Sequence, residues 1–275
     1  IFYYGRSVGP FWDEPKEKRI FKQQAKRILK YASYVSLRDA TSIKIAQDLG
    51  IEGVIETTDT AFLDYPQVDI PNEILSGIGN KNYVVFVPNS LIWHYYYRDR
   101  ATKKEVIAYW SAVAKVIAKH YPMHKIVMLP QLSLQGISMD DKYLFQDIRE
   151  HCLKLDIFVT DDIYSSDIQQ QIIRGADAVF GARYHSIVFA INNNVPFISL
   201  SYEHKMSGLL EEIDLCDEMI DITQLFSSEE ENIRVLKQLE ERIPLIHQNP
   251  NGQKLAKNKA RMAFNIFVEK IRCIL

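Results

Sequence analysis

The chain has 275 residues, of which 47% are hydrophobic and 25% are charged, as in soluble globular proteins and unlike disordered or fibrous ones. Its 33 basic and 35 acidic residues are spread along the chain and leave a net charge of -2, which argues against nucleic acid as a partner. Three widely spaced cysteines predict neither a disulfide framework nor a metal site, and no apolar run approaches the roughly 20 residues of a membrane span. We therefore expect a cytoplasmic protein.

Short apolar runs of strand length alternate with helical patterns along the whole chain. Such alternation predicts an α/β fold with parallel sheets and crossover helices. The clearest helix lies between residues 101 and 122, where Val106, Trp110 and Val113 recur at helical spacing. The strands are expected at residues 1–4, 34–37, 83–87, 125–129, 157–160, 178–180 and 197–200.

The length of the chain favours two domains, and the stretch 64–82, rich in Pro, Gly and Asn, predicts a linker between them. We expect an N-terminal Rossmann-like domain over residues 1–75 and a C-terminal one over residues 76–250. Residues 251–275 mix apolar residues with Lys and Arg, which predicts a closing helix packed on the protein, with binding to a membrane surface as the alternative. The chain starts without methionine and with a strand under way, so we expect a preceding part, in which a targeting signal is not excluded.

The stretch GARYHSIVFAINNNVPFISLSYEHK predicts the exit of a strand, a short helix and a further strand. In such a unit, ligands bind beyond the carboxyl ends of the strands, where the amino termini of helices present N–H groups. Arg183, His185 and Ser186 follow the first strand, whereas Glu203 and Lys205 follow the second. Both groups are therefore expected on one rim.

These side chains suit a small anion. A guanidinium such as Arg183 offers paired donors to a carboxylate or phosphate, Lys205 adds a point charge, and His185 can move a proton near neutral pH. The alternative is structural, with an ion pair between Arg183 and Glu203 and with His185 as a helix cap. The local pattern leaves both interpretations open.

A second cluster follows the strand expected at 34–37. Arg38 stands beside a helix amino terminus, where a cation is unfavourable unless an anion or an acidic residue compensates it. Asp39 or Thr41 is expected to cap that helix. Asp59 is expected either to line a cleft between the domains or to form a turn.

Two further stretches carry weaker signals. LIWHYYYRDR, residues 91–100, combines aromatic rings with polar tips, which suits sugar binding as well as a partly buried helix surface. Later in the chain, Ser138 or Asp140 is expected to cap a helix. Binding of an acceptor by Asp140 and Asp141 is the less favoured alternative.

Several segments together resemble one family, the polysaccharide pyruvyl transferases. Their order and spacing match across most of the chain, and the last segment is the most specific. The segments are GRSVGPF at 5–11, VSLRDATS at 35–42, TDTAF at 58–62 and GARYHSIVFAINNNVPFISLSYEHKMSGLLEEI at 181–213. The first strands and the glycine-containing loop of the family's N-terminal domain are not recognisable in this chain.

The resemblance implies a GT-B-like fold, with two Rossmann-like domains around an interdomain cleft. It also implies transfer of a pyruvyl group from phosphoenolpyruvate to two hydroxyls of a sugar, which forms a cyclic ketal and releases phosphate without a metal or a cofactor. The acceptor would belong to a cell-surface polysaccharide, such as an exopolysaccharide or capsule, or to its precursor, in lipid-linked or polymeric form. Such an enzyme would work in the cytoplasm or in peripheral association with the inner face of the cell membrane.

The RxH motif of the family matches Arg183, Tyr184 and His185, which makes Arg183 and His185 the expected catalytic residues. His185 is expected to act as general acid/base, because the enol carbon gains a proton while the sugar hydroxyls lose theirs. Arg183 would bind the donor anion, and Lys205 would assist the departing phosphate. The residues expected to bind substrate are Arg38, Asp59, Tyr184, Ser186, Glu203 and Lys205.

Two other functions stay open. A glycosyltransferase of similar two-domain shape would use a nucleotide sugar and would need a surface for its base and ribose. A catalytically silent relative would bind carbohydrate without releasing phosphate, and the presence of both Arg183 and His185 argues against it.

Overall fold

The computed structural model describes residues 1–9, 11, 15–132 and 140–273, so that Pro10 and Ser138 of the segments above lie outside the described residues. Contacts between Cα atoms divide the chain into two units. Unit 1 comprises Ile1–Asp64, His204–Cys216 and Asn251–Leu275, and unit 2 comprises Tyr65–Glu203 and Asp217–Pro250. Both units are discontinuous in sequence, unlike the division expected above, whose boundaries stay predictions about independently folding parts.

Unit 1 is built on a three-stranded parallel sheet in the order β1-β2-β3. Its strands are β1 (Phe2–Arg6), β2 (Tyr34–Leu37) and β3 (Ile55–Glu56). Its helices are α1 (Pro15–Tyr31), α2 (Ala40–Asp48), the 3-10 helix η1 (Thr60–Leu63), α8 (His204–Glu212) and, apart from its first residue, α10 (Pro250–Arg272). The pairing of β1 with β2 shifts register around Gly5, whose φ of 61° favours glycine and where a Cβ would meet Thr60 Cγ2 at 2.7 Å.

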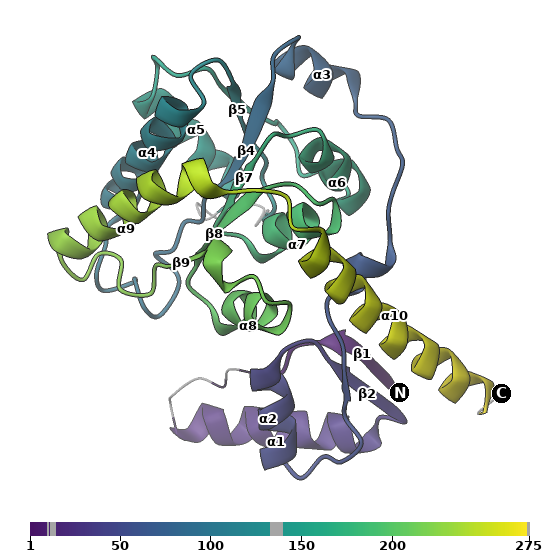
Figure 1. Cartoon of the computed structure of the whole chain (residues 1–275). Helices are drawn as coiled ribbons and strands as arrows, with labels where there is room; N and C mark the ends of the chain where they lie inside the picture. Colours follow the sequence, from purple (N-terminus) through teal and green to yellow (C-terminus); the bar gives the residue numbers. More distant parts are fainter. Residues whose placement is uncertain (10, 12–14, 133–139, 274–275) are drawn as a thin grey trace. The chain divides into compact units, whose positions relative to one another are not determined.

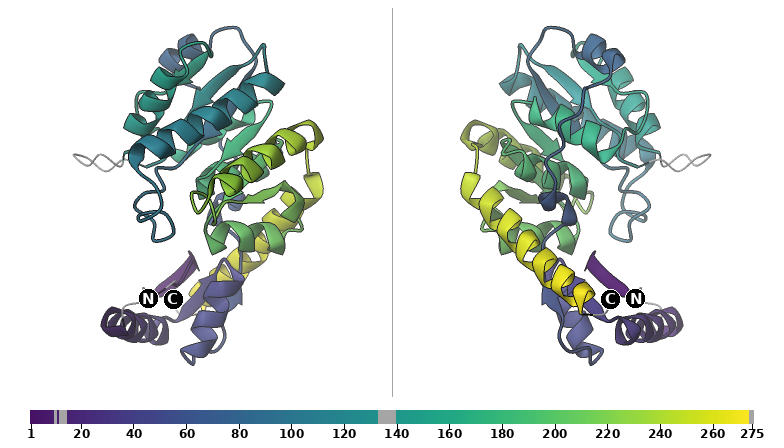
Figure 2. Two further views of the ribbon diagram at one scale, coloured as in Figure 1. Left: turned by 90° about the vertical axis from the view of Figure 1, so that its left-hand side faces the viewer. Right: turned by 90° about the vertical axis from the view of Figure 1, so that its right-hand side faces the viewer.

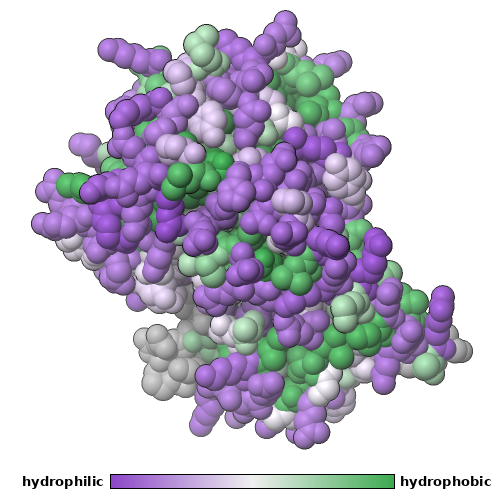
Figure 3. Space-filling model, viewed as in Figure 1, coloured by the Kyte–Doolittle hydropathy of each residue, from purple (hydrophilic) through white to green (hydrophobic). Residues whose placement is uncertain are grey.

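The helix α10 packs in unit 1 through small side chains. Its buried positions are Gly252, Ala256, Ala260 and Ala263. The Tyr34 hydroxyl of β2 donates to the Ala263 carbonyl at 2.9 Å, and the Thr58 hydroxyl donates to the Ala256 carbonyl at 2.9 Å. Small residues permit this close approach to the helix backbone. Other side chains of α10 leave apolar area on the surface (Figure 3), namely Leu255, Met262, Phe264 and Ile266.

Unit 2 is built on a six-stranded parallel sheet in the order β6-β5-β4-β7-β8-β9 (Figure 1). Its strands are β4 (Tyr83–Val87), β5 (Lys125–Met128), β6 (Ile157–Val159), β7 (Val179–Gly181), β8 (Phe197–Ser201) and β9 (Met219–Asp221). Numbered from β4 as the first strand, this order is 3-2-1-4-5-6, which is that of the Rossmann fold.

Helices cover both faces of this sheet. They are α3 (Asn72–Ile78), α4 (Lys103–His120), α5 (Asp141–His151), α6 (Ser166–Arg174), α7 (Tyr184–Asn192) and α9 (Glu229–Arg242), with short 3-10 helices η2 (Cys216–Glu218) and η3 (Ile243–Leu245). One face carries α4, α5 and α9, and the other carries α6 and α7 (Figure 2). The core between these layers is apolar, and Phe86, Trp110, Phe145 and Phe180 are fully buried.

The mixed α/β fold with parallel sheets is confirmed. All seven expected strands are present, with ends displaced by no more than two residues. β3 and β9 were not expected, because two or three residues are too few for an apolar pattern to stand out. α4 falls within the expected range and starts with a capping box between Thr102 and Glu105. Among the described helices, none combines the length and apolar composition that crossing a membrane requires.

Candidate functional site

The strand order of unit 2 reverses between β4 and β7, which lie next to each other in the sheet. In Rossmann-like sheets the crossovers on either side of this point run to opposite faces, which leaves a crevice outside the carboxyl ends where ligands bind. Asn89 follows β4 and Arg183 follows β7. The candidate site of unit 2 is therefore the group of side chains at this edge.

The helix α7 starts earlier than the sequence predicted. Tyr184, His185 and Ser186 form its first turn instead of the end of a loop, and Arg183 occupies the N-cap position. Gly181 allows this tight passage, because a Cβ there would lie 2.2 Å from Ser186 Oγ. No acidic residue lies in the first turn, so the partial positive charge of the helix amino terminus is not offset from within the turn.

Arg183 is held by a buried carboxylate. Its Nη2 donates to Asp141 Oδ1, and Asp141, the first residue of α5, is fully buried. Asp141 Oδ2 accepts from the backbone N–H groups of Gln131 and Leu132, at 3.0 and 2.9 Å. Burial raises the pKa of Asp141, whereas Arg183 and the two backbone donors oppose that rise. The carboxylate thus ties the segment after β5 to the start of α7.

This pairing corrects one alternative from the sequence. Arg183 pairs with Asp141 and not with Glu203, and His185 lies inside the first turn of α7 and not at its cap. The sequence had given Asp141 only a minor role, as an acceptor-binding residue. Its one usable signal was its place directly after the helix cap Asp140, whose side chain accepts from the Lys142 N–H.

The exits of β4 and β8 are joined by Asn89 and Tyr202. The Asn89 side-chain amide donates to the Tyr202 hydroxyl at 2.6 Å, and both residues are buried. The ring of His94 meets that of Tyr202 edge-on, with 5.2 Å between centroids. Burial raises the pKa of Tyr202, to which Glu203 adds and which the positive charge of Arg183 opposes. Residues that follow β4, β7 and β8 therefore interact at one edge of the sheet.

The remaining residues predicted from the RxH segment have distinct surroundings. The His185 ring lies 5.3 Å from that of Tyr184 and 5.8 Å from that of Phe189, between centroids. Ser186 is fully buried, and its hydroxyl donates to the Arg183 carbonyl at 2.6 Å. Ser186 thus stabilises the turn that carries Arg183.

The two residues predicted after β8 fall in different units. Glu203 directly follows Tyr202 and is the last residue of its segment of unit 2. Lys205 lies in the first turn of α8 and belongs to unit 1.

A second arginine cluster lies within unit 1. Arg38, directly after β2, pairs with Asp59 and donates from Nε to Ser7 Oγ at 3.0 Å. Asp59 caps η1 by accepting from the Ala61 N–H at 3.0 Å. Ser7, Arg38 and Asp59 come from three of the segments quoted above, GRSVGPF, VSLRDATS and TDTAF. These segments, distant in sequence, converge on one guanidinium.

Of the two caps that the sequence offered for α2, Asp39 is the one used. Its side chain accepts from the backbone N–H and the hydroxyl of Ser42, both at 2.7 Å. The same serine hydroxyl accepts from the Val8 N–H at 2.8 Å. The cap therefore also fixes the segment after β1 that carries Ser7.

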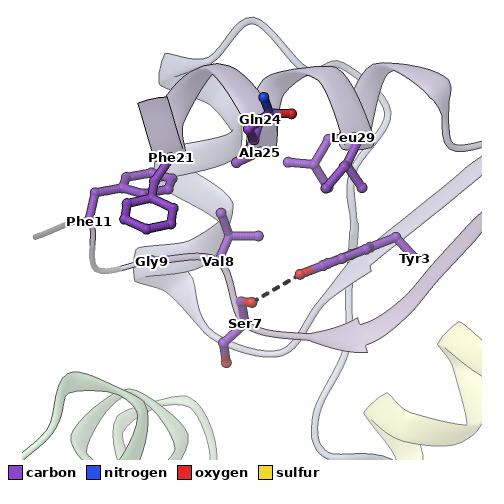
Figure 4. Close-up of a pocket in the computed structure, with 10 residues that line it drawn as sticks. Tyr3, Ser7, Val8, Gly9, Phe11, Phe21, Gln24, Ala25 and Leu29 are labelled. Carbon is purple, nitrogen blue, oxygen red and sulfur yellow. Dashed lines mark hydrogen bonds between the residues drawn. The ribbon is translucent and has the colours of Figure 1, made fainter. Parts of the chain in front are cut away.

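Beside this cluster, a pocket of about 330 Å³ opens between the segment after β1 and α1 (Figure 4). It is lined mostly by apolar side chains, including Tyr3, Val8, Phe21 and Leu29, and Ser7 stands at its edge. Such a lining does not match a small, highly charged donor. Within the described parts of the chain, no group of three or more His, Cys, Asp or Glu side chains is placed to hold a metal ion.

A family model for polysaccharide pyruvyl transferases matches residues 1–204, which is most of the chain. The chain belongs to the polysaccharide pyruvyl transferase family. The resemblance seen in the sequence is thereby confirmed, and the matched range contains Arg38, Asp59, Arg183 and His185.

A curated relative of this pyruvyl transferase family chain is the amylovoran biosynthesis protein AmsJ of Erwinia amylovora. The two are 23% identical over 235 residues, which cover 82% of this chain and 54% of AmsJ. The chain thus spans about half the length of that relative. The match links the family chain to polysaccharide biosynthesis.

Solved structures of GT-B enzymes share the fold. A UDP-GlcNAc 2-epimerase of Methanocaldococcus jannaschii matches with a TM-score of 0.56 and 10% identity, over 97% of this chain and 68% of that one. A UDP-forming trehalose-phosphate synthase of Burkholderia xenovorans matches with a TM-score of 0.51 and 10% identity, over 98% and 67%. The expected GT-B-like class is confirmed, and identities this low carry no further conclusion.

Proposed function

We propose that this chain belongs to an enzyme that transfers a pyruvyl group from phosphoenolpyruvate to two hydroxyls of a sugar, forming a cyclic ketal and releasing phosphate. The observation that carries the proposal is the position of Arg183 and His185 at the first turn of α7, beside the point where the strand order of a Rossmann-like sheet reverses. The family match and the name of AmsJ support a polysaccharide, or its precursor, as the acceptor class.

The donor carries a carboxylate and a phosphate, and the proposal assigns each a cationic partner. A guanidinium binds such groups through two parallel N–H donors, and a helix amino terminus adds partial positive charge. Arg183 has both features, since it precedes α7 directly. Arg38 is proposed as a second donor-binding residue, and Lys205 as a cation that stabilises the leaving phosphate.

The reaction needs one proton to be moved to carbon and two to be removed from oxygen. The methylene carbon of phosphoenolpyruvate gains a proton and becomes a methyl group, while the adjacent carbon forms bonds to two sugar oxygens. The bond from that carbon to the phosphate oxygen breaks. Of the two hydroxyl protons, one balances the proton gained by carbon and the other leaves with the phosphate. His185 is proposed to carry these protons as general acid/base.

The other predicted residues take supporting roles in the proposal. Ser186 and Asp59 already bond the Arg183 carbonyl and the Arg38 guanidinium, so we assign them to holding these arginines. Tyr184 and Glu203 are proposed to contact the sugar. No cofactor is required, because neither carbon is oxidised or reduced overall.

The place of action is also a proposal. A lipid-linked acceptor would put the enzyme in the cytoplasm at the inner face of the cell membrane. Peripheral association would be supported by α10, whose exposed apolar residues Leu255, Met262 and Ile266 are accompanied by Lys254 and Arg261. Sedimentation with vesicles of anionic lipid tests this point, and absence of binding would remove it.

The deciding experiment uses the complete protein, phosphoenolpyruvate and a panel of cell-surface glycan precursors. Phosphate release that depends on a sugar, together with a pyruvate-sized gain in the mass of that sugar, is the expected result. A nucleotide-sugar glycosyltransferase of the same fold is the competing function, so thermal melting is compared with phosphoenolpyruvate and with several nucleotide sugars. Only a ligand that binds the folded protein raises its melting temperature. Stabilisation by a nucleotide sugar alone would reject the proposal.

A further inference from the structure

Asp141 is a fully buried carboxylate with all of its described partners in fixed elements of unit 2. One oxygen accepts from two backbone N–H groups of the segment after β5, and the other accepts from Arg183. With no exposed surface, Asp141 has no direct access to a substrate. Any effect of Asp141 on the reaction must therefore act through Arg183.

The geometry fixes more than a charge. Two backbone donors on Oδ2 hold the carboxylate in one plane, and Oδ1 then determines where Nη2 of Arg183 lies. A guanidinium is planar and rigid, so fixing one of its nitrogens restricts the direction of the whole fork. Arg183 Nε is buried and has no hydrogen-bond partner among the described residues. Within that part of the chain, Asp141 is the contact that orients this side chain.

We propose that Asp141 is a positioning residue that directs the Arg183 guanidinium toward the anionic group of the donor. This inference rests on the proposed function, because the donor is phosphoenolpyruvate. A loss of orientation costs more than a loss of packing, since a reacting group displaced by about 1 Å can lower the rate about 100-fold.

Asparagine at position 141 separates positioning from size. Asp141 accepts with both oxygens, whereas an asparagine of the same shape accepts with only one and donates with the other end. In D141N, either the guanidinium or the pair of backbone N–H groups must face an amide NH2, so the fork has to turn or the loop has to move. Asp177→Asn is the matched control. Asp177 lies in unit 2 just before β7, at the opposite edge of the sheet, where it contacts His124 at 2.7 Å.

The first measurement does not depend on activity. The Nε–Hε signal of Arg183 is observed by NMR in the complete protein labelled with 15N-arginine, and R183K assigns it by its disappearance. We expect D141N to shift or broaden this signal and D177N to leave it in place. An unchanged signal in D141N would overturn the inference.

The second measurement is kinetic. We expect D141N to raise the KM for phosphoenolpyruvate or lower kcat, with kcat/KM for this donor reduced about 10- to 100-fold and the KM for the sugar unchanged. A merely structural carboxylate would instead lower the melting temperature and the active fraction with both KM values preserved, and that result would overturn the inference. A wild-type protein without phosphoenolpyruvate-dependent transfer would reject the proposed function, and the NMR signal would still decide whether Asp141 orients Arg183.

Discussion

Lys259 on α10 donates a hydrogen bond to Glu212 on α8, with 2.8 Å between Nζ and Oε1. The same ammonium reaches Glu56 on β3 at 2.9 Å, so one side chain joins the three segments that form unit 1. Burial raises the pKa of Glu212 to about 7, against the lowering effect of Lys259. Its Oε2 is buried without a hydrogen-bond partner among the described residues, which accounts for the cost of ionising it.

This raised pKa makes stability depend on pH. Between the ordinary value of 4.5 and about 7, folded Glu212 holds a proton that the unfolded chain releases, so the free energy of unfolding falls as the pH rises. The pKa of Glu56 is lowered and that of Lys259 is raised, so both titrate outside this window. We expect Glu212→Gln to be flatter than wild type by about 1–3 kcal/mol from about pH 5 to about pH 8, at roughly 1.4 kcal/mol per pKa unit. Urea unfolding at both pH values measures this, and parallel profiles would contradict it.

Arg183→Lys tests the planar fork against a simple charge. Lysine keeps the positive charge but cannot offer two parallel N–H donors to a carboxylate or phosphate. We expect the affinity for phosphoenolpyruvate, measured by calorimetry, to fall about 10- to 100-fold, in line with roughly 1.5–3 kcal/mol for a hydrogen bond to a charged group. Arg174→Lys is the control, because Arg174 ends α6 and bonds Asn193 and Gln171. An equal loss of affinity in both variants would show that Arg183 has no specific part in donor binding.

The local unit from β7 to β8 could be predicted from the sequence because its apolar runs are long and its turn residues distinct. The pair of Arg183 with Asp141 could not, since 42 residues and two further strands separate the two positions. Such a pair follows from the strand order, and strand order depends on contacts between distant segments. Asp141 also looked like an ordinary residue of a helix amino terminus, where acidic side chains are common without any other role.

The same reasoning explains the membership of α10 in unit 1. The stripe of Gly252, Ala256 and Ala260 is visible in the sequence and predicts close packing of a helix. The surface that receives it includes Thr58 and Leu215, which come from two other segments of the chain. A sequence pattern predicts that a helix has a packing face, but the partner of that face is set by the folded chain.

Gly181→Ala is expected to destabilise the passage from β7 to α7. The new Cβ would lie 2.2 Å from Ser186 Oγ and 3.0 Å from Ile187 Cδ1, inside the range of normal contacts. Overpacking of this kind costs about 1–3 kcal/mol of unfolding free energy. The double variant with Ser186→Ala removes the closest atom, so it should be more stable than the sum of the two single changes indicates. Denaturant unfolding of the four proteins measures this coupling, and strict additivity would contradict the predicted clash.

His185→Ala tests the proposed proton transfer directly. The imidazole rests against the rings of Tyr184 and Phe189 at the start of α7, and alanine favours helix, so we expect the variant to fold. General acid/base catalysis contributes about 100- to 10,000-fold, so ketal formation should fall by at least about 100-fold while phosphoenolpyruvate still raises the melting temperature. His151→Ala, an exposed histidine at the end of α5, is the matched control and should keep the wild-type rate. A His185→Ala enzyme that forms the ketal as fast as this control would remove the histidine from the mechanism and leave donor binding as the only role of the RxH segment.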